Sequence, residues 1–280
     1  MINKNNRNFL SRNLIRISLL AWGLSVLYPI LWTAYTSLKD NKQLFADAWA
    51  LPKVLHFENY VNAWINSNIA SNFLNSFFVT IIATFLSLVL SATTSYVLAR
   101  YKFKGDKVLY TILISAMMIP HVLAIIPLFF LLEKMNMLNS LFGLSLVYTS
   151  MVIPLGIFIL TSFFKTLPKE LEEAAEVDGC GHFAIFFKIM LPLSKSGLIT
   201  VGLMNLIVFW NEYFMGLVFL QEPTKYTLPV GIAYLAEESA YRADWGALFA
   251  GLVIAMVPII VIYSLFQKRI TEGLTSGALK

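Results

Sequence analysis

The densest cluster of ionisable side chains in this chain is acidic and lies between residues 170 and 178. Only 13% of the residues are charged, yet five of these nine positions are carboxylates: Glu170, Glu172, Glu173, Glu176 and Asp178. Carboxylates at this density are repelled by the anionic inner leaflet of a membrane, whereas they complement a basic groove on another protein. The chemistry that this cluster predicts is therefore electrostatic docking.

The residues around the cluster predict a bent pair of short helices. Pro168 is tolerated in the first turn of the first helix, and Thr166 is placed to cap it. One face of this helix is small and allows another backbone to come close: Leu171, Ala174, Ala175 and Asp178. The glycines of the segment 178–181 end the helix. A second helix follows, with an aromatic face that rests on the membrane or packs under the helix bundle: Phe183, Phe186, Phe187 and Met190.

Other catalytic and metal-binding chemistries lack their usual residue patterns. The histidines His56, His121 and His182 are scattered, and neither H-E-x-x-H nor C-x-x-C occurs. The single cysteine, Cys180, cannot form an intrachain disulfide. No G-x-x-x-x-G-K-[ST] loop is present to hold a nucleotide. The sequence therefore predicts no metal site and no cofactor in this chain.

The acidic segment interrupts a chain that is suited to lipid. Hydrophobic residues make up 58% of the sequence, and they form unbroken runs that predict six spans of about 20 residues each. Because lipid cannot hydrogen-bond the backbone, these spans are expected to be helices. The first run is too long for a signal peptide and no cleavage site follows it. The spans are predicted at residues 14–36, 72–99, 108–132, 141–163, 197–220 and 247–266.

The loops between these spans alternate in their lysine and arginine content. Of the 21 basic residues, 15 fall on the side that holds both termini and the acidic segment. The other six are Lys39, Lys42, Lys53, Lys134, Lys225 and Arg242. The positive-inside rule places the richer side in the cytoplasm. Since the basic residues orient the chain in this way, the net charge of +5 does not indicate nucleic-acid binding.

Two groups of residues within the spans are candidates for a translocation path. Pro120 and Pro127 bend their span beside His121, although ordinary packing kinks and a packing histidine are the alternative. Glu212 is the only acid deep in a predicted span, which makes it a functional candidate. The alternative is that Glu212 holds the bundle together through hydrogen bonds. Its amphipathic neighbours are further candidates to line such a path: Trp210, Asn211 and Tyr213.

Six short motifs occur in register along nearly the whole chain. The most specific is E-A-A-x-x-D-G followed by I-x-L-P, at residues 173–179 and 189–192. The others are Leu51-Pro52, Glu58-Asn59-Tyr60 with Asn75-Ser76, Met118-Ile119-Pro120 with Ile126-Pro127-Leu128, Trp210-Asn211-Glu212, and Gly273-Leu274-Thr275 with Gly277. Together they resemble the permease subunits of binding-protein-dependent ABC importers, in the MalG-like branch that imports sugars. Cys180 departs from this family, which more often has alanine there.

The resemblance implies a type I ABC importer permease fold with a cytoplasmic coupling helix between spans four and five. Two partner ATPase subunits would bind ATP and magnesium. Further implied partners are a MalF-like second permease, an extracytoplasmic solute-binding protein and a sugar, in the cell membrane of a prokaryote. Glu173 would pair with a basic residue of the ATPase, and Gly179 would allow the sharp exit from the helix. The other implied coupling residues are Glu172, Ala174, Ala175, Asp178, Phe183, Phe186 and Phe187.

The implied organisation has three parts. Residues 1–71 hold the N-terminus, first span and first outer loop, residues 72–268 the permease core with the coupling loop 164–196, and residues 269–280 a cytoplasmic tail. The outer loop 221–246 would meet the solute-binding protein. Its aromatic residues would make that contact, or would lie in the interface belt of the membrane: Tyr226, Tyr234, Tyr241 and Trp245.

Two other classes of membrane protein fit the sequence less well. A secondary transporter driven by an ion gradient would show repeated halves and several buried ionisable groups. A membrane-embedded hydrolase would need a nucleophile and a base at membrane depth, where His121 is the only histidine, and no G-x-S-x-G is present. The sequence therefore favours a permease subunit that is not itself an enzyme.

Overall fold

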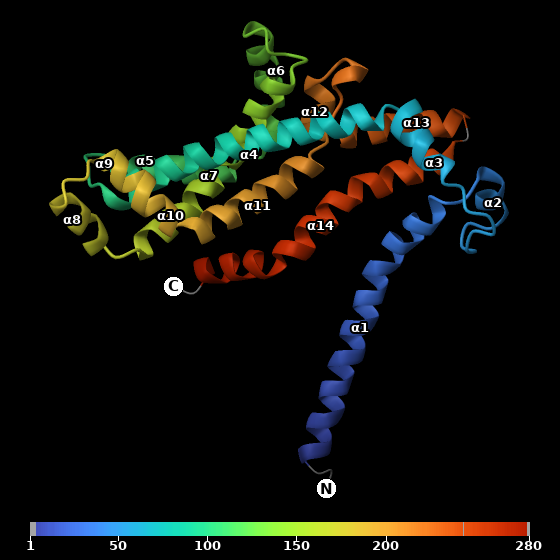
Figure 1. The fold of residues 1–280 in the computed structure, drawn as a ribbon, viewed down its shortest axis with the longest axis horizontal. Coiled ribbons are helices and arrows are strands. Elements are labelled where there is room, and N and C mark those ends of the chain that lie inside the picture. Colours follow the sequence, from blue (N-terminus) through green and yellow to red (C-terminus); the bar gives the residue numbers. More distant parts are fainter. Residues whose placement is uncertain (1–3, 243, 279–280) are drawn as a thin grey trace. The chain divides into compact units, whose positions relative to one another are not determined.

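The computed structural model describes the backbone of residues 4–242 and 244–278 and the side chains of residues 12–241 and 244–268. Within these residues the regular structure is helical and contains no strand, which confirms the expected all-α class (Figure 1). The chain divides into two compact units. The first-loop unit comprises Met1–Ile69 with Ile232–Met256, and the core unit comprises Ala70–Gly231 with Val257–Lys280.

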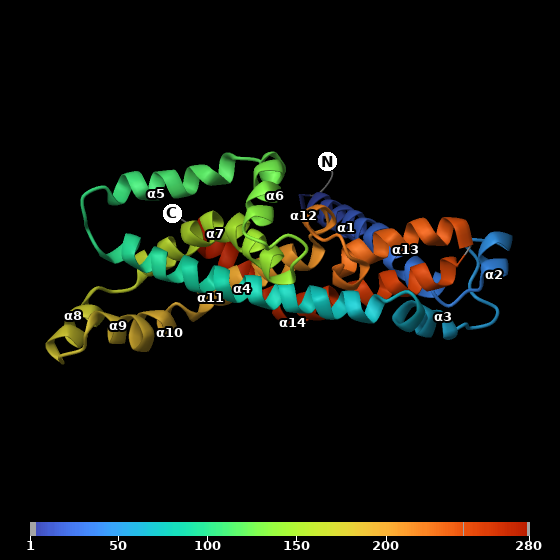
Figure 2. The ribbon, with the colours of Figure 1, turned by 90° about the horizontal axis from the view of Figure 1, so that it is seen from above.

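The core unit is built on three helices that pack along one another. Its helices are α4 (Ile69–Arg100), α5 (Asp106–Ser115), α6 (Ile125–Lys134), α7 (Leu141–Thr166), α11 (Lys195–Asn211) and α12 (Phe214–Phe219). Figures 1 and 2 show α4, α7 and α11 side by side. Gly156 of α7 lies where an added Cβ would be 2.5 Å from the Ser91 hydroxyl of α4, so glycine allows these two helices to approach.

Four helices are long and apolar enough to cross a membrane, and two bent helix pairs raise the number to six if each pair is one span. The four are Arg12–Thr36, Ile69–Arg100, Leu141–Thr166 and Trp245–Lys268. They contain the predicted first, second, fourth and sixth spans. The predicted tail at residues 269–280 continues helix α14 (Trp245–Ala278), but its side chains and residues 279–280 lie outside the described residues.

The predicted span at residues 108–132 is broken at Pro120, where the sequence predicted a bend. Helices α5 and α6 meet at 96°, with short 3-10 turns at Ala116–Met118 and His121–Ala124 between them (Figure 2). Proline has no backbone N–H and disfavours helical geometry in the residue before it, and Ile119 is accordingly extended. Pro127 lies in the first turn of α6, where proline is tolerated, and does not bend that helix.

The predicted continuous span at residues 197–220 is also interrupted. Helix α11 ends at Asn211, Glu212 is extended, and α12 starts at Phe214. The Glu212 carboxylate accepts hydrogen bonds from the backbone N–H groups of Met215 and Gly216, at 2.9 and 3.2 Å. These groups have no partner at a helix start unless a side chain supplies one, so Glu212 caps α12 and stabilises the break.

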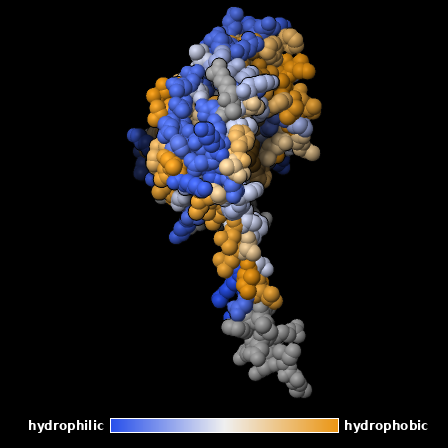
Figure 3. All heavy atoms as spheres, turned by 90° about the vertical axis from the view of Figure 1, so that its right-hand side faces the viewer, coloured by the Kyte–Doolittle hydropathy of each residue, from blue (hydrophilic) through white to orange (hydrophobic). Residues whose placement is uncertain are grey.

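The first-loop unit contains α1 (Lys4–Thr36), α2 (Asn41–Ala46), α3 (Glu58–Val61), a π-helix at Asn62–Asn66, most of α13 (Leu228–Arg242) and the start of α14. Its centre is Lys39, whose Nζ donates to the carbonyl oxygens of Asp47 and Ala48 at 3.2 and 3.0 Å. Lys39 is 1% exposed, and this burial lowers its pKa. Asn59 Nδ2 donates to the carbonyls of Ser37 and Lys39. Figure 3, which faces this unit, shows hydrophilic atoms over its looped end and hydrophobic atoms along α1.

Candidate functional site

The acidic segment folds as the predicted bent pair of helices, named here the elbow and comprising residues 170–193. It contains α8 (Glu170–Val177), α9 (His182–Ile185), a π-helix at Phe186–Met190 and α10 (Leu191–Leu193). Gly179 has a φ of +77°, and the N–H groups of Gly179 and Cys180 donate to the carbonyls of Glu176 and Ala175. This pair of hydrogen bonds is the Schellman arrangement, which confirms that the glycine ends α8.

The start of α8 differs from the prediction. Thr166 does not cap this helix, because α7 extends to Thr166 and its hydroxyl donates to the carbonyl of Phe163 within α7. Lys169 occupies the cap position without a side-chain hydrogen bond, and Pro168 precedes it, outside the first turn. Three carboxylates in the first turn take over the stabilising role, since negative charge is favourable at the start of a helix.

The elbow has an exposed side that carries most of its acids. Glu170, Glu173, Glu176 and Asp178 are all exposed. Val177 of α8 is 88% exposed, and Phe183 of α9, which borders an open cavity beside α4, is 83% exposed. Ala174, Gly179 and Phe187 are exposed as well. An acidic surface with exposed apolar side chains is suited to a basic partner surface that also offers apolar pockets.

The opposite side of the elbow packs into the core unit. Its predicted coupling residues Ala175 and Phe186 are buried, together with Met190. The predicted small face and aromatic face are therefore each divided between the two sides, because Ala174 and Phe183 point outward. The π-helix at Phe186–Met190 contributes to this division, since its wider turn changes which residues share a face.

Glu172 lies on the inner side and forms an ion pair within the chain. Its Oε2 is 3.2 Å from Nε of Arg100, the last residue of α4. Nη2 of Arg100 donates to the carbonyl of Leu167 at 2.8 Å. The two paired side chains are 5% and 15% exposed. Arg100 is one of the 15 basic residues whose charge was predicted to orient the chain. A basic residue in the last turn of a long helix was the available signal, but nothing in the sequence identified its partner.

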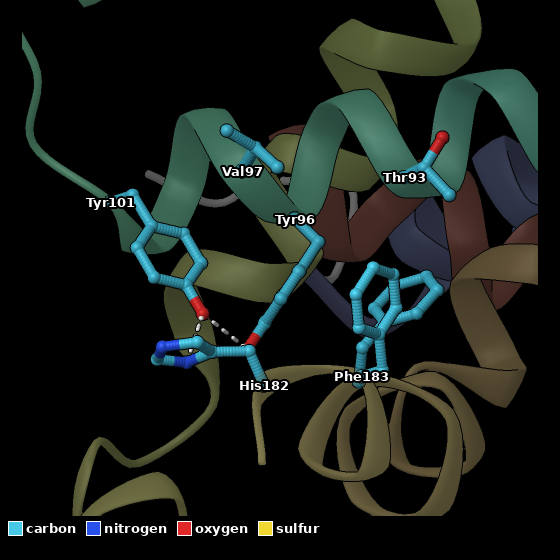
Figure 4. A pocket seen from close by; sticks show the side chains of 7 residues that line it. Thr93, Tyr96, Val97, Tyr101, His182 and Phe183 are labelled. Carbon is cyan, nitrogen blue, oxygen red and sulfur yellow. Dashed lines mark hydrogen bonds between the residues drawn. The ribbon is translucent and has the colours of Figure 1, made fainter.

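An aromatic contact lies beside this ion pair. The Tyr101 hydroxyl is 3.1 Å from Nδ1 of His182, and Figure 4 shows these two side chains pointing at each other. The rings of Tyr96 and Phe186 pack with centroids 5.0 Å apart. The same residues, with Thr93, Val97 and Phe183, line an open apolar cavity of about 370 Å³. The end of α4 therefore contacts the elbow through both an ionic and an aromatic group of side chains.

The structure places the translocation-path candidates in different environments. Glu212 caps α12 and accepts a hydrogen bond from the Tyr148 hydroxyl at 2.6 Å, which supports the bundle-holding alternative. Trp210 is buried, with its ring 5.2 Å from that of Phe73. The candidates on the surface of the chain are Pro120, His121, Asn211 and Tyr213.

The aromatic residues predicted to meet a solute-binding protein also differ in exposure. Tyr226 is buried in the same core cluster as Tyr148. Tyr234 and Tyr241 of α13 are exposed. Trp245 is partly buried, and its backbone N–H donates to Asn41. Across the described side chains, no group of three or more His, Cys, Asp or Glu residues is arranged to hold a metal ion.

Comparisons with known proteins agree on one family. Residues 91–276 match the family described as binding-protein-dependent transport system inner membrane component. The diacetylchitobiose uptake system permease protein NgcG of Streptomyces coelicolor is 37% identical over 94% of this chain and 87% of its own. The sulfoquinovosyl glycerol transport system permease protein SmoH of Agrobacterium fabrum is 34% identical over 91% and 89%. A crystal structure of a bacterial ABC transporter that imports alginate has a similar fold, with a TM-score of 0.81, 23% identity and coverage of 96% and 98%.

Proposed function

This chain belongs to the family of binding-protein-dependent transport system inner membrane components, and on that premise we propose that it forms half of the translocation path of an ATP-driven carbohydrate importer. It is a transport subunit, and ATP hydrolysis belongs to partner subunits. The proposed complex contains two ATPases, which bind ATP and magnesium, a MalF-like second permease and an extracytoplasmic solute-binding protein.

The single observation that carries the docking proposal is the two-sided elbow. Its inner side is fixed to the core unit through buried contacts such as Phe186, while its outer side leaves Glu173 and Val177 exposed. In this proposal Glu173 pairs with a basic residue of an ATPase, and the left-handed Gly179 allows the chain to leave the contact sharply. Of the residues implied by resemblance, Ala174, Asp178, Phe183 and Phe187 also face outward.

The proposed substrate class is carbohydrate. Both relatives named above carry carbohydrate substrates in their names, diacetylchitobiose for NgcG and sulfoquinovosyl glycerol for SmoH. In the proposed importer a separate binding protein selects the sugar, and the exposed Tyr234 and Tyr241 are its candidate contacts. His121, Asn211 and Tyr213 remain candidates for the path itself, whereas Glu212 is proposed to hold the bundle.

The proposed orientation follows the distribution of basic residues. The elbow and both termini lie in the cytoplasm, because that side carries 15 of the 21 lysines and arginines. In this orientation the acidic surface of the elbow faces the cytoplasm. ATP is available on that side, and the proposed ATPases bind there. The location is the cell membrane of a prokaryote.

Affinity purification of the full chain from its native membrane, with mass spectrometry of the bound proteins, tests the proposal. We expect an ATPase and a second permease, and the co-purifying binding protein should identify the sugar. Glu173→Ala or Gly179→Pro should weaken ATPase binding or uncouple hydrolysis from uptake. A chain that purifies alone, with uptake that follows an ion gradient and ignores ATP depletion, would instead support the secondary transporter.

A further inference from the structure

We propose that Arg100 is a positioning residue for transport, because it ties the elbow to α4 so that movement of the elbow turns that helix. This inference rests on the proposed function, in which ATPases move the elbow. Arg100 itself touches no substrate and no ATPase in this proposal. Its role is to keep the elbow and α4 in a fixed relative orientation, so that a movement of the elbow moves α4 with it.

The geometry of the Arg100 contacts supports this role. One guanidinium group reaches two points of the chain, Glu172 in α8 and the carbonyl of Leu167 in the segment between α7 and α8. The Leu167 contact is a hydrogen bond from Nη2, whereas Nε makes no hydrogen bond and meets the Glu172 carboxylate as an ion pair at 3.2 Å. Because the guanidinium is planar, contacts at two of its nitrogens restrict its orientation. A single lysine ammonium would be a point charge with no such constraint. The tie therefore resists rotation of α8 as well as separation from α4.

The burial of this pair points to a role other than stability. Both side chains lie largely away from water, at 5% and 15% exposure. Removing two charges from water costs about as much as their attraction returns, so an apolar pair of similar volume is usually as stable or more stable. Apolar contacts are non-directional and would allow the two helices to slide. The Arg100–Glu172 pair therefore adds a preferred relative orientation of α4 and α8, not stability.

The neighbouring aromatic contact does not replace this tie. Tyr96 and Phe186 pack together, but the cavity of about 370 Å³ beside them leaves part of the surface between α4 and α9 unfilled (Figure 4). The hydrogen bond between Tyr101 and His182 lies at the edge of the same cavity. The rings of Tyr96 and Phe186 are buried and also pack on Phe164, but such apolar contacts are non-directional, so Arg100 provides the directional contact.

Helix α4 is suited to carry such a movement into the core unit. It runs without interruption for 32 residues and contacts α7 where Ser91 faces Gly156. At the other end of the tie, two consecutive residues of α8 differ in exposure. Glu172 points inward to Arg100, while Glu173 is exposed toward the proposed ATPase. The outer contact and the inner tie therefore lie within one helical turn.

The decisive experiment replaces the ion pair by an apolar pair of similar volume. The double variant Arg100→Met with Glu172→Leu would be reconstituted as the complete complex, and solute uptake would be measured per ATP hydrolysed. We expect unchanged ATPase content and only the small loss of thermal stability that follows from the lost hydrogen bond to the Leu167 carbonyl. Uptake per ATP should be about tenfold lower, which corresponds to about 1.4 kcal/mol. Uptake per ATP equal to that of the wild type would overturn the inference and leave the pair a packing contact.

A control and a second variant keep the outcomes distinct. Lys102→Met breaks an exposed ion pair with Asp106 near the same end of α4, at 3.8 Å, and should leave uptake per ATP unchanged. If the double variant is missing from the membrane, Arg100→Lys decides, because it keeps the charge but loses the fork. We expect uptake per ATP to fall about threefold in that variant, and wild-type coupling would overturn the inference. Failure of the wild-type complex to contain an ATPase would overturn the proposed function instead.

Discussion

Lys39 in the first-loop unit and Arg100 where α4 meets the elbow both have largely buried side chains, and the two cations are held in opposite ways. Lys39 makes no ion pair among the described side chains and is held by two backbone carbonyls, of Asp47 and Ala48. Arg100 pairs with the carboxylate of Glu172 and also binds the carbonyl of Leu167. The first arrangement contains a net charge, whereas the second is neutral overall.

The sequence distance between each cation and its partners indicates which parts of the chain the cation connects. The partners of Lys39 are 8 and 9 residues away in the chain, so the lysine closes one loop on itself. The carbonyl partner of Arg100 is 67 residues away, and Arg100 therefore joins separate helices. A local clamp should affect the stability of its own loop, while a link between helices should also affect how movement passes between them. The following variants test that distinction, in order of decreasing effect.

Arg100→Gln should cause the largest loss of stability. It leaves the Glu172 carboxylate largely buried without its charged partner, and breaking a buried ion pair in this way costs about 3 kcal/mol. Adding Glu172→Gln should recover part of that loss, because no charge is then left unpaired. Thermal unfolding of the purified complex measures both. A double variant that is as unstable as the sum of the two single variants would show that the residues do not act as a pair.

Lys39→Met should cost about 2 kcal/mol, because it removes a charged donor from the carbonyls of Asp47 and Ala48. The Ala48 carbonyl keeps its hydrogen bond from Trp32 Nε1, so the loss falls mainly on the Asp47 carbonyl. The loss should appear as easier proteolysis within residues 40–57, with uptake per ATP hydrolysed unchanged. A fall in uptake per ATP would show that the contacts of Lys39 also transmit movement. The proposed difference between Lys39 and Arg100 would then be wrong.

The pH dependence of the same loop should follow the lysine. Burial lowers the pKa of Lys39 from its usual 10.5, so the unfolded loop binds the proton more tightly than the folded loop. Stability should therefore rise with pH between the lowered pKa and 10.5 and become constant above it. Lys39→Met should abolish that rise. Protease resistance of the loop, compared between the two proteins across alkaline pH, measures it, and an equal rise in both would exclude Lys39 as its source.

Gly179→Ala should have the smallest effect of these variants on stability, about 1 kcal/mol. No atom lies within 4 Å of the position that an added Cβ would take, so the cost comes from the positive φ alone. Asparagine tolerates this conformation better, and Gly179→Asn should cost less than Gly179→Ala. Binding of the ATPase to the two variants should fall in the same order. Equal binding would mean that the exit from α8 does not contribute to docking.

Hydropathy predicted where the chain crosses the membrane, but it could not predict where the crossings break. The third span ends its first helix at Pro120, which was recognised as a bend, although the 96° angle depends on the backbone geometry of Ile119. The break at Glu212 was not predicted, because an acid in an apolar run carries no sign of which amides it will cap. The tertiary contact with Tyr148, together with the local hydrogen bonds from the N–H groups of α12, selects that conformation.

In the candidate site, too, the sequence predicted the local features but not the contacts between distant residues. The acidic cluster and the glycine that ends α8 could be predicted from the sequence, because both depend on neighbouring residues in the chain. The inward orientation of Glu172 depends on Arg100, which is distant in the sequence, and no local pattern distinguishes Glu172 from Glu173. Lys39 was likewise counted only for its charge, because its burial depends on how the first loop folds over it.

Site-directed cross-linking compares the two regions most directly and tests the claim that the elbow is the ATPase contact. In a Cys180→Ala background, one cysteine would be placed on the elbow by Ala174→Cys and, separately, on the first-loop unit by Phe57→Cys, since both positions are exposed. Membranes holding the complete complex would be treated with a short thiol-to-amine cross-linker and the adducts identified by mass spectrometry. The account predicts an ATPase adduct from Ala174→Cys and none from Phe57→Cys. An ATPase adduct from the first-loop position, or none from the elbow in an intact complex, would contradict it.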